Sequence, residues 1–210
     1  MKTIAVFGAS GRTGTEIINI ALEKGFYINA LYRNKSTITL SHNNLNIIEG
    51  DILKFSNVKS VIEGSGYVIC AIGTKPPFKD VFCSEGTKNI IKGMYDYNLT
   101  RLTCITGAMI GDYPGILSGF MNKLKLRFNK SYPLISLDRL KQEMAIKASG
   151  LNWTILKPPR LTESSLSKYK MSENLRITGF SSISRKTIAS LIFDIIENES
   201  TYQKTLFVKK

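Results

Sequence analysis

The stretch that decides the fold is the start of the chain, Lys2-Thr-Ile-Ala-Val-Phe-Gly8-Ala-Ser-Gly11-Arg-Thr-Gly14. Its apolar run predicts a strand, its three glycines spaced three apart predict a turn, and the apolar spacing beyond Gly14 predicts an amphipathic helix. This arrangement directs backbone N–H groups and the positive end of a helix dipole toward one point, where a pyrophosphate can bind. We therefore predict a dinucleotide site with contacts from Gly8, Ser10, Gly11, Arg12, Thr13 and Gly14.

The length and composition of the chain predict a single domain. With 210 residues, of which 43% are hydrophobic, the chain can bury one full core. No apolar run approaches the length of a membrane span, and the N-terminus enters a strand without the layout of a signal peptide, so we expect a cytoplasmic protein. The three cysteines lie in apolar contexts without Cys-x-x-Cys spacing, which favours reduced core thiols and no metal site.

The formal net charge of +13 at pH 7 raises the question of nucleic-acid binding. The basic residues are spread along a chain rich in Lys, Asn and Ile, so we expect no nucleic-acid partner. The one dense patch, Lys123–Lys130, favours a solvated helix face, with a docking site for a protein partner or an anionic surface as the alternative. The charge should attract anionic cofactors and substrates to a protein that we expect to be a monomer.

Strand and helix patterns alternate along the chain, which predicts successive βαβ units. Right-handed crossovers then give a Rossmann-type, doubly wound parallel sheet in one α/β domain over residues 1–210, with ligands outside the carboxyl ends of the strands. The polar segment 158–179 is long for a loop, and we expect it to wall the substrate pocket. The predicted strands are 2–8, 27–32, 46–49, 67–71, 102–106 and 152–156, and the predicted helices are 13–24, 53–62, 80–97, 137–149 and 185–197, the last capped by Ser184.

Arg33 stands at the end of the second predicted strand, where an NAD-specific site generally carries a carboxylate for the ribose 2′-hydroxyl. A guanidinium suits a 2′-phosphate because it donates two parallel charge-assisted hydrogen bonds. Lys35, Ser36 and Arg12 are the residues that we expect to assist Arg33. We therefore predict NADP(H) as the cofactor, with an ordinary exposed arginine as the alternative interpretation of Arg33.

Two further strand ends carry candidate site residues. The fourth strand ends at Ile72-Gly73-Thr74, where Gly73 lets the backbone approach the cofactor and Thr74 can donate to a phosphate or a ribose. The third strand ends at Gly50-Asp51-Ile52, where Asp51 is placed to cap the helix that follows.

Seven motifs occur in an order and spacing that resemble one family. They are the glycine turn 8–14, Arg33, and the segments 50–51, 72–74, 84–90, 149–155 and 158–162. Together they resemble the NAD(P)H-binding, NmrA-like atypical short-chain dehydrogenase/reductases, and most of all the biliverdin IX-beta reductase (flavin reductase) family and its bacterial relatives. The resemblance implies NADPH-dependent reduction of a flavin such as FMN, or of a linear tetrapyrrole, on the nicotinamide face. It also implies an adenine contact at Asp51 and Ile52.

The chain departs from the short-chain dehydrogenase pattern in the helix after the fifth strand. A carbonyl needs a proton donor as the hydride arrives, which a Tyr-x-x-x-Lys pair supplies in that superfamily. Here Ile135 and Arg139 stand at the two positions, and Tyr132 stands in a Tyr-Pro pair that favours a turn. Carbonyl–alcohol chemistry is therefore disfavoured. Gly107 and Arg160 stand where the close relatives carry serine and histidine, which weakens the assignment of a tetrapyrrole.

A flavin requires less of the protein, because positioning and an electrostatic partner for the developing negative charge suffice. We predict Arg160 as that partner, assisted by Thr106 or Lys75; alternatively, Arg160 binds a cofactor phosphate or pairs with Glu143 or Glu163. The sequence therefore predicts a reductase of planar acceptors such as flavins or quinones, and the alternative is a non-catalytic NADP(H) sensor read by a protein partner. The residues expected to line the acceptor pocket are Lys75, Met109, Tyr113 and Pro158.

Overall fold

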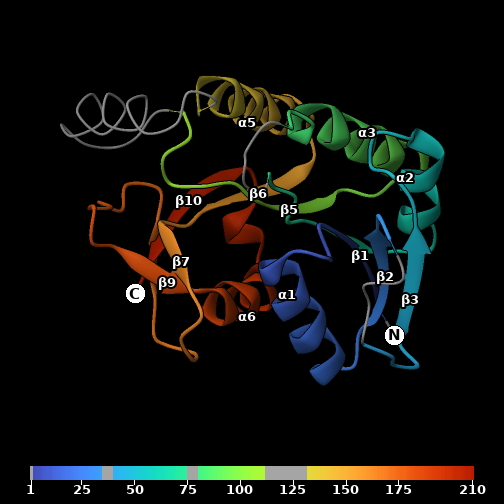
Figure 1. Ribbon diagram of the computed structural model, residues 1–210, viewed down its shortest axis with the longest axis horizontal. Coiled ribbons are helices and arrows are strands. Elements are labelled where there is room, and N and C mark those ends of the chain that lie inside the picture. Colours follow the sequence, from blue (N-terminus) through green and yellow to red (C-terminus); the bar gives the residue numbers. More distant parts are fainter. Residues whose placement is uncertain (1, 35–39, 75–79, 112–131) are drawn as a thin grey trace.

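The computed structural model describes residues 2–34, 40–74, 80–111 and 132–210, which form three layers around a central sheet (Figure 1). Helices α1 (Arg12–Glu23) and α6 (Arg185–Ile195) cover one face, and α2 (Phe55–Ile62), α3 (Cys83–Asp96) and α5 (Tyr132–Lys147) cover the other. The strands, in spatial order, are β3 (Leu45–Glu49), β2 (Tyr27–Tyr32), β1 (Thr3–Phe7), β4 (Tyr67–Cys70), β5 (Arg101–Ile105), β6 (Asn152–Lys157), β10 (Lys204–Lys209) and β8 (Lys170–Ser172).

Strand β1 shows how the sheet divides the core. Ile4 and Val6 belong to the apolar cluster on the side of α1 and α6, whereas Ala5 and Phe7 belong to the cluster on the side of α2, α3 and α5. Successive side chains of a strand point to opposite faces, and all four of these are fully buried. Because helices cover both faces, the strand forms a continuous apolar run rather than an alternating one.

The strand order reverses between the neighbouring strands β1 and β4. β1 pairs in parallel with β2 on one side and with β4 on the other, and later strands add outward from each. Such a switch point opens a crevice at the carboxyl ends of the strands, which is where the glycine turn follows β1. The predicted Rossmann-type fold in a single domain is therefore confirmed. Among the described strands of this sheet, only β8 is antiparallel to its neighbour, β10.

The C-terminal third of the chain contains strands that the sequence pattern did not predict. β10 extends the sheet in parallel with β6, while β7 (Arg160–Thr162) and β9 (Ser182–Ser184) form a second, two-stranded sheet. The segment 158–179 is therefore not a plain loop, because it contains β7 and β8. Strands of three residues are too short to show alternation, so their partners define them. A 3-10 turn, η2 (Glu199–Thr201), precedes β10.

The start of α6 agrees with the prediction because its local cap is present. The hydroxyl of Ser184 accepts the backbone N–H of Thr187 at 3.0 Å, as predicted for the start of α6. Helix α5 begins at Tyr132, earlier than predicted, so the Tyr-Pro pair lies in a first turn rather than before the helix. Proline is tolerated there because the first helical N–H groups have no intrahelical partner.

Over the described ranges, no helix is long and apolar enough to cross a membrane, and no group of three His, Cys, Asp or Glu side chains is placed to hold a metal ion. The three cysteines, Cys70, Cys83 and Cys104, are buried free thiols, as predicted. Burial raises the pKa of Cys83 to about 12, so this group stays protonated at neutral pH.

Candidate active site

A cavity of about 680 Å³ lies at the switch point, where β1, β2, β4 and β5 end. Its size is that of a small-molecule or cofactor site. It brings together residues that are far apart in the sequence, from Gly8 to Arg185, most of them from the predicted cofactor set. The predicted residues on its wall are Gly8, Ser10, Gly11, Arg12, Thr13, Arg33, Ile52, Ile72, Gly73, Thr74 and Thr106.

Gly8 and Gly14 have no room for a side chain. Gly8 has a φ of +86°, and a Cβ on it would lie 2.5 Å from the carbonyl carbon and oxygen of Ala71. A Cβ on Gly14 would overlap the carbonyl oxygen of Gly8 and would lie 2.8 Å from the Cα of Ala9. Helix α1 therefore begins directly on the turn. Its unpaired N-terminal N–H groups and its dipole make this turn a cradle that fits a pyrophosphate.

Arg33 lies on the cavity wall after the end of β2, with its side chain exposed. Within the described residues it has no ion-pair partner, so its guanidinium is available to an anion. Asp51 has a different place. Its carboxylate accepts the N–H of Leu53 at 2.9 Å, and its own N–H donates to Oδ1 of Asn57 at 3.0 Å. Asp51 thus holds the turn before α2 and positions Ile52 on the wall, but it does not cap the helix as predicted, because α2 begins at Phe55 with Lys54 as its N-cap. The predicted cofactor contact of Asp51 stays a prediction.

Four arginines, Arg12, Arg33, Arg139 and Arg185, lie on this wall, and the described part of the chain contributes no Asp or Glu to it. Arg12 and Arg185 are the first residues of α1 and α6, where the helix dipoles add partial positive charge. Charges of one sign in a cleft concentrate ligands of the other sign. The cavity is therefore suited to a ligand that carries several negative charges.

Arg139 reaches the cavity from α5. Its Nη1 donates to Oε1 of Gln142 at 2.7 Å, and its Nη2 lies 3.1 Å from the place that a Cβ on Gly73 would take. Gln142 is fully buried, and its Nε2 donates to the hydroxyl of Thr87 at 2.9 Å and faces the sulfur of Cys104 at 3.6 Å. A buried amide held on both sides thus fixes the guanidinium beside the end of β4.

Thr106 lies on the wall after the end of β5 and belongs to a buried polar network. Its hydroxyl donates to Oε1 of Glu143 at 2.7 Å, and Oε2 of Glu143 accepts from Nζ of Lys157 at 3.1 Å. The side chains of this ion pair are 3% and 2% exposed, and Lys157 also donates to the carbonyl of Ile110. Because its hydrogen points to Glu143, Thr106 offers lone pairs to a ligand N–H rather than a proton.

Comparison with known proteins agrees with this geometry. The model of a family described as NAD(P)H-binding matches residues 8–199, which is most of the chain. The chain belongs to this NAD(P)H-binding family. An uncharacterised chloroplast protein of Arabidopsis thaliana is 25% identical over 213 residues, covering 96% of this chain and 75% of that protein.

Three solved structures illustrate how widely this fold is shared. A Rossmann-fold NAD(P)-binding family protein from Shigella flexneri has a TM-score of 0.76 at 25% identity, covering 99% of this chain and 93% of its own. A short-chain dehydrogenase/reductase from Veillonella parvula, solved with NADP, has a TM-score of 0.82 at 17% identity, with coverages of 100% and 94%. ChuY of Escherichia coli O157:H7, an anaerobillin reductase, scores 0.80 at 16% identity, with coverages of 99% and 96%. At 16–17% identity the likeness concerns the fold alone.

The family-level resemblance is thus confirmed, whereas the biliverdin IX-beta reductase subgroup stays a prediction. Some predicted site residues of this NAD(P)H-binding protein lie off the cavity wall. Met109 is half-buried in the loop after β5, and Pro158 is buried, with its carbonyl accepting the N–H of Ala108 at 2.8 Å. Arg160 is exposed at the start of β7. The roles predicted for these residues at the acceptor stay predictions.

The alternative partners considered for Arg160 are otherwise engaged. Glu143 pairs with Lys157, and Glu163 pairs with Arg12 and Arg185, so neither forms an ion pair with Arg160 in the described structure. Several predictions fall outside the described residues altogether. These are the roles of Lys35, Ser36, Lys75 and Tyr113, and the basic segment 123–130.

Sequence reasoning did not name seven other residues of the described wall as site residues: Leu31, Ala71, Phe82, Ile105, Arg139, Leu161 and Arg185. A signal for Arg185 was present, because a cation at the first position of a helix opposes the helix dipole, and α6 has no acidic residue in its first turn to compensate. A residue placed against its local preference is a candidate for a role in binding. Arg139 had a signal too, as it stands at the lysine position of the short-chain dehydrogenase pattern.

Proposed function

We propose that this NAD(P)H-binding protein is an NADPH-dependent reductase that transfers hydride to a flavin such as FMN, or to another planar acceptor such as a quinone or a linear tetrapyrrole. The observation that carries the proposal is the wall of the cavity, which has Arg33 at the end of β2 and Arg139 with Thr106 at the ends of β4 and β5. The dinucleotide, when bound, supplies the hydride.

The cofactor end favours NADP(H) over NAD(H). A carboxylate that would bind the ribose 2′-hydroxyl is replaced by Arg33, whose guanidinium matches the geometry of a phosphate. Arg12, on the same wall, adds a second cation. The Veillonella parvula protein, which shares the fold, was solved with NADP. This precedent supports a phosphorylated dinucleotide as the ligand class of the fold.

The acceptor end provides charge stabilisation rather than a proton. Within the described contacts, Arg139 uses one of its five N–H donors on Gln142, which leaves donors for the negative charge that develops on a flavin or quinone as hydride arrives. Thr106 offers an acceptor for a ligand N–H. A ketone would need a proton donor at this place, whereas a flavin can take its later proton from water. ChuY, an anaerobillin reductase of the same fold, is a precedent for a planar acceptor.

The test is NADPH oxidation by the purified protein with FMN, biliverdin, quinones, simple ketones and secondary alcohols. We expect turnover of at least one planar acceptor and none of the ketones or alcohols. Arg139→Met should lower kcat for that acceptor by about 10²–10³-fold, the usual loss when one preorganised donor is removed, while the Kd of NADPH changes less. Arg160→Ala, at an exposed position, tests the role that the sequence predicts for that residue in the same assay. Robust oxidation of secondary alcohols would refute the proposal.

A second candidate function is a non-catalytic NADP(H) sensor, favoured by an apolar stripe on α5. The side chains of Leu134, Leu137, Leu140 and Met144 recur near the helical period and are 36–61% exposed. Exposed apolar side chains in a row are typical of contact surfaces for proteins. Tight NADPH binding without turnover of any acceptor in the panel would select this function.

A further inference from the structure

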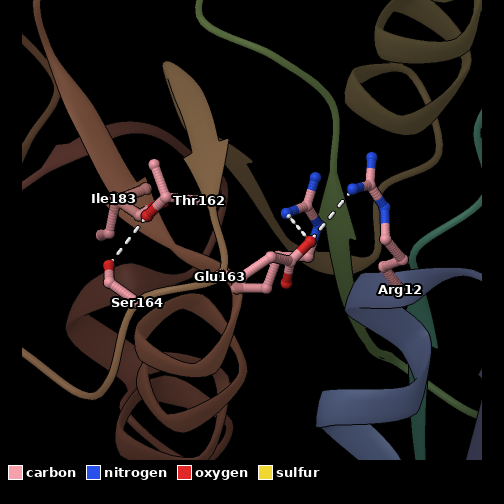
Figure 2. Close-up of polar contacts among 6 residues, drawn as sticks. Arg12, Thr162, Glu163, Ser164 and Ile183 are labelled. Carbon is pink, nitrogen blue, oxygen red and sulfur yellow. Dashed lines mark hydrogen bonds and ion pairs between the residues drawn. The ribbon is translucent and has the colours of Figure 1, made fainter.

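One carboxylate, that of Glu163, lies between two arginines of the cavity wall (Figure 2). Its Oε1 accepts from Nη1 of Arg12 at 3.0 Å and from Nη1 of Arg185 at 2.6 Å. Glu163 follows β7, whereas the arginines begin α1 and α6, so three distant segments of the chain meet at this oxygen. The Glu163 carboxylate is thus an oxyanion of the protein itself, and it occupies the place where the cavity offers two guanidinium groups and two helix N-termini.

The carboxylate is placed by an anchored segment of backbone. Just before it, Thr162 pairs with Ser184 in the small sheet. Just after it, the N–H of Ser167 donates to the hydroxyl of Thr187 at 3.0 Å, which ties the segment to α6. The Glu163 side chain itself is 59% exposed. The backbone thus keeps the carboxylate close to the arginines, while the side chain has room to rotate into solvent.

The charges at this place do not accommodate a second anion beside Glu163. Arg12, Arg185 and Glu163 carry a net charge of +1, and a phosphate group that reached both arginines would meet the carboxylate at contact distance. Arg12 is 76% exposed, so its pair with Glu163 is weak, whereas Arg185 is 11% exposed and its pair is less screened. Release of Arg12 therefore costs little, and a more highly charged oxyanion regains at Arg185 the less screened contact that the carboxylate gives up.

We propose that Glu163 is an internal competitor for the phosphate oxyanion of the dinucleotide, holding Arg12 and Arg185 until the ligand displaces it. The identity of the oxyanion rests on the proposed function. Glu163 thereby lowers the affinity for the cofactor and releases the segment after β7 when the cofactor binds. Its removal leaves a net charge of +2 at the site, so phosphate ligands bind more tightly.

The test compares the Kd of NADP⁺ for the wild type, Glu163→Gln and Glu163→Ala by calorimetry, with the Tm of each variant as a check on folding. The proposal predicts that both variants bind NADP⁺ about 3–10-fold more tightly at 0.15 M salt. Glu23→Gln is the matched control, because Glu23 is exposed at the other end of α1, about 16 Å from Arg12 and beyond the Debye length of about 8 Å. Unchanged or weaker binding by the Glu163 variants, or an equal gain in Glu23→Gln, would overturn it.

A second probe separates this proposal from the proposed function. Inorganic pyrophosphate, titrated while the Tm is followed, should raise the Tm of Glu163→Gln more than that of the wild type. If NADP⁺ binds no variant but pyrophosphate still shows this difference, the competition stands and the proposed function falls. If NADP⁺ binds the wild type and neither probe shows a gain in the variants, the competition falls and the proposed function stands.

Discussion

Asp138 links the stability of the fold to the candidate site, and its replacement by alanine is the most informative single perturbation. This buried carboxylate on α5 accepts the N–H groups of Cys83 and Ser84 at 2.8 and 3.0 Å, and the hydroxyl of Ser84 at 2.6 Å. It therefore caps the N-terminus of α3 from another helix, in the absence of a side-chain cap at Phe82. Phe82, which precedes Cys83, and Arg139, which follows Asp138, both lie on the cavity wall.

The expected loss can be worked from these three bonds. Loss of a helix N-cap costs about 0.5–2 kcal/mol. A buried N–H left without a partner costs about 1–3 kcal/mol. These two costs overlap, because the same N–H groups are counted in both, so we expect Asp138→Ala to lower the free energy of unfolding by about 2–4 kcal/mol. For a domain of this size that corresponds to a fall in Tm of about 5–15 °C.

The pKa of Asp138 predicts the pH dependence of this loss. Burial alone would raise that pKa, but the hydrogen bonds from Ser84 and Cys83 and the charge of Arg139 outweigh burial. The pKa of Asp138 therefore lies below the ordinary aspartate value of 3.8. A carboxyl whose pKa is lower in the folded state stabilises the fold above its unfolded pKa, and this contribution is lost as the pH falls through the folded value. The difference between wild type and Asp138→Ala should therefore be full at pH 7 and shrink below pH 3.8.

Urea unfolding at pH 7 and at a series of acid pH values measures both quantities. The matched control is Asp96→Ala, at the opposite end of α3, where the carboxylate forms an exposed ion pair with Lys59. Exposed pairs contribute about 0–1 kcal/mol, so the control should stay close to the wild type. A loss below 0.5 kcal/mol in Asp138→Ala, or a loss independent of pH down to pH 2, would refute the reasoning.

Three further predictions concern the site and its support. Arg33→Glu should reduce or reverse a preference for NADPH over NADH in paired titrations, and an NADH preference in the wild type would contradict the assignment of Arg33. Gly14→Ala should abolish NADPH binding and lower Tm, because its Cβ would overlap the carbonyl oxygen of Gly8; normal binding would show that the turn can relax. Lys157→Met should cost about 3–5 kcal/mol in urea unfolding by leaving the Glu143 carboxylate buried without its partner, and the double variant with Glu143→Leu should recover part of that loss.

The part of the molecule that the sequence alone determined is the part built from adjacent residues. The strand, glycine turn and helix at residues 3–23 follow one another without interruption, and the steric need of Gly14 comes from Gly8 and Ala9 within that turn. The close contact at Gly8 is with Ala71, which the packing of β4 beside β1 brings there. Local periodicity likewise predicted most of the helices and the first six strands. Because the switch point of a doubly wound sheet follows from strand order, the place of the cofactor site was also predictable.

Only the tertiary structure decided which side chains complete the site. Arg139 and Arg185 come from helices on opposite faces of the sheet. Gln142 lies one turn from Arg139 on α5, but it is held by contacts with Thr87 on α3 and Cys104 on β5, and Arg185 is held by Glu163 from a separate segment. Arg160, which the sequence favoured at the acceptor, lies exposed on a strand of three residues that exists only because β9 pairs with it. Periodicity reports which face of an element is apolar, whereas the meeting of polar groups from distant segments depends on how the elements pack.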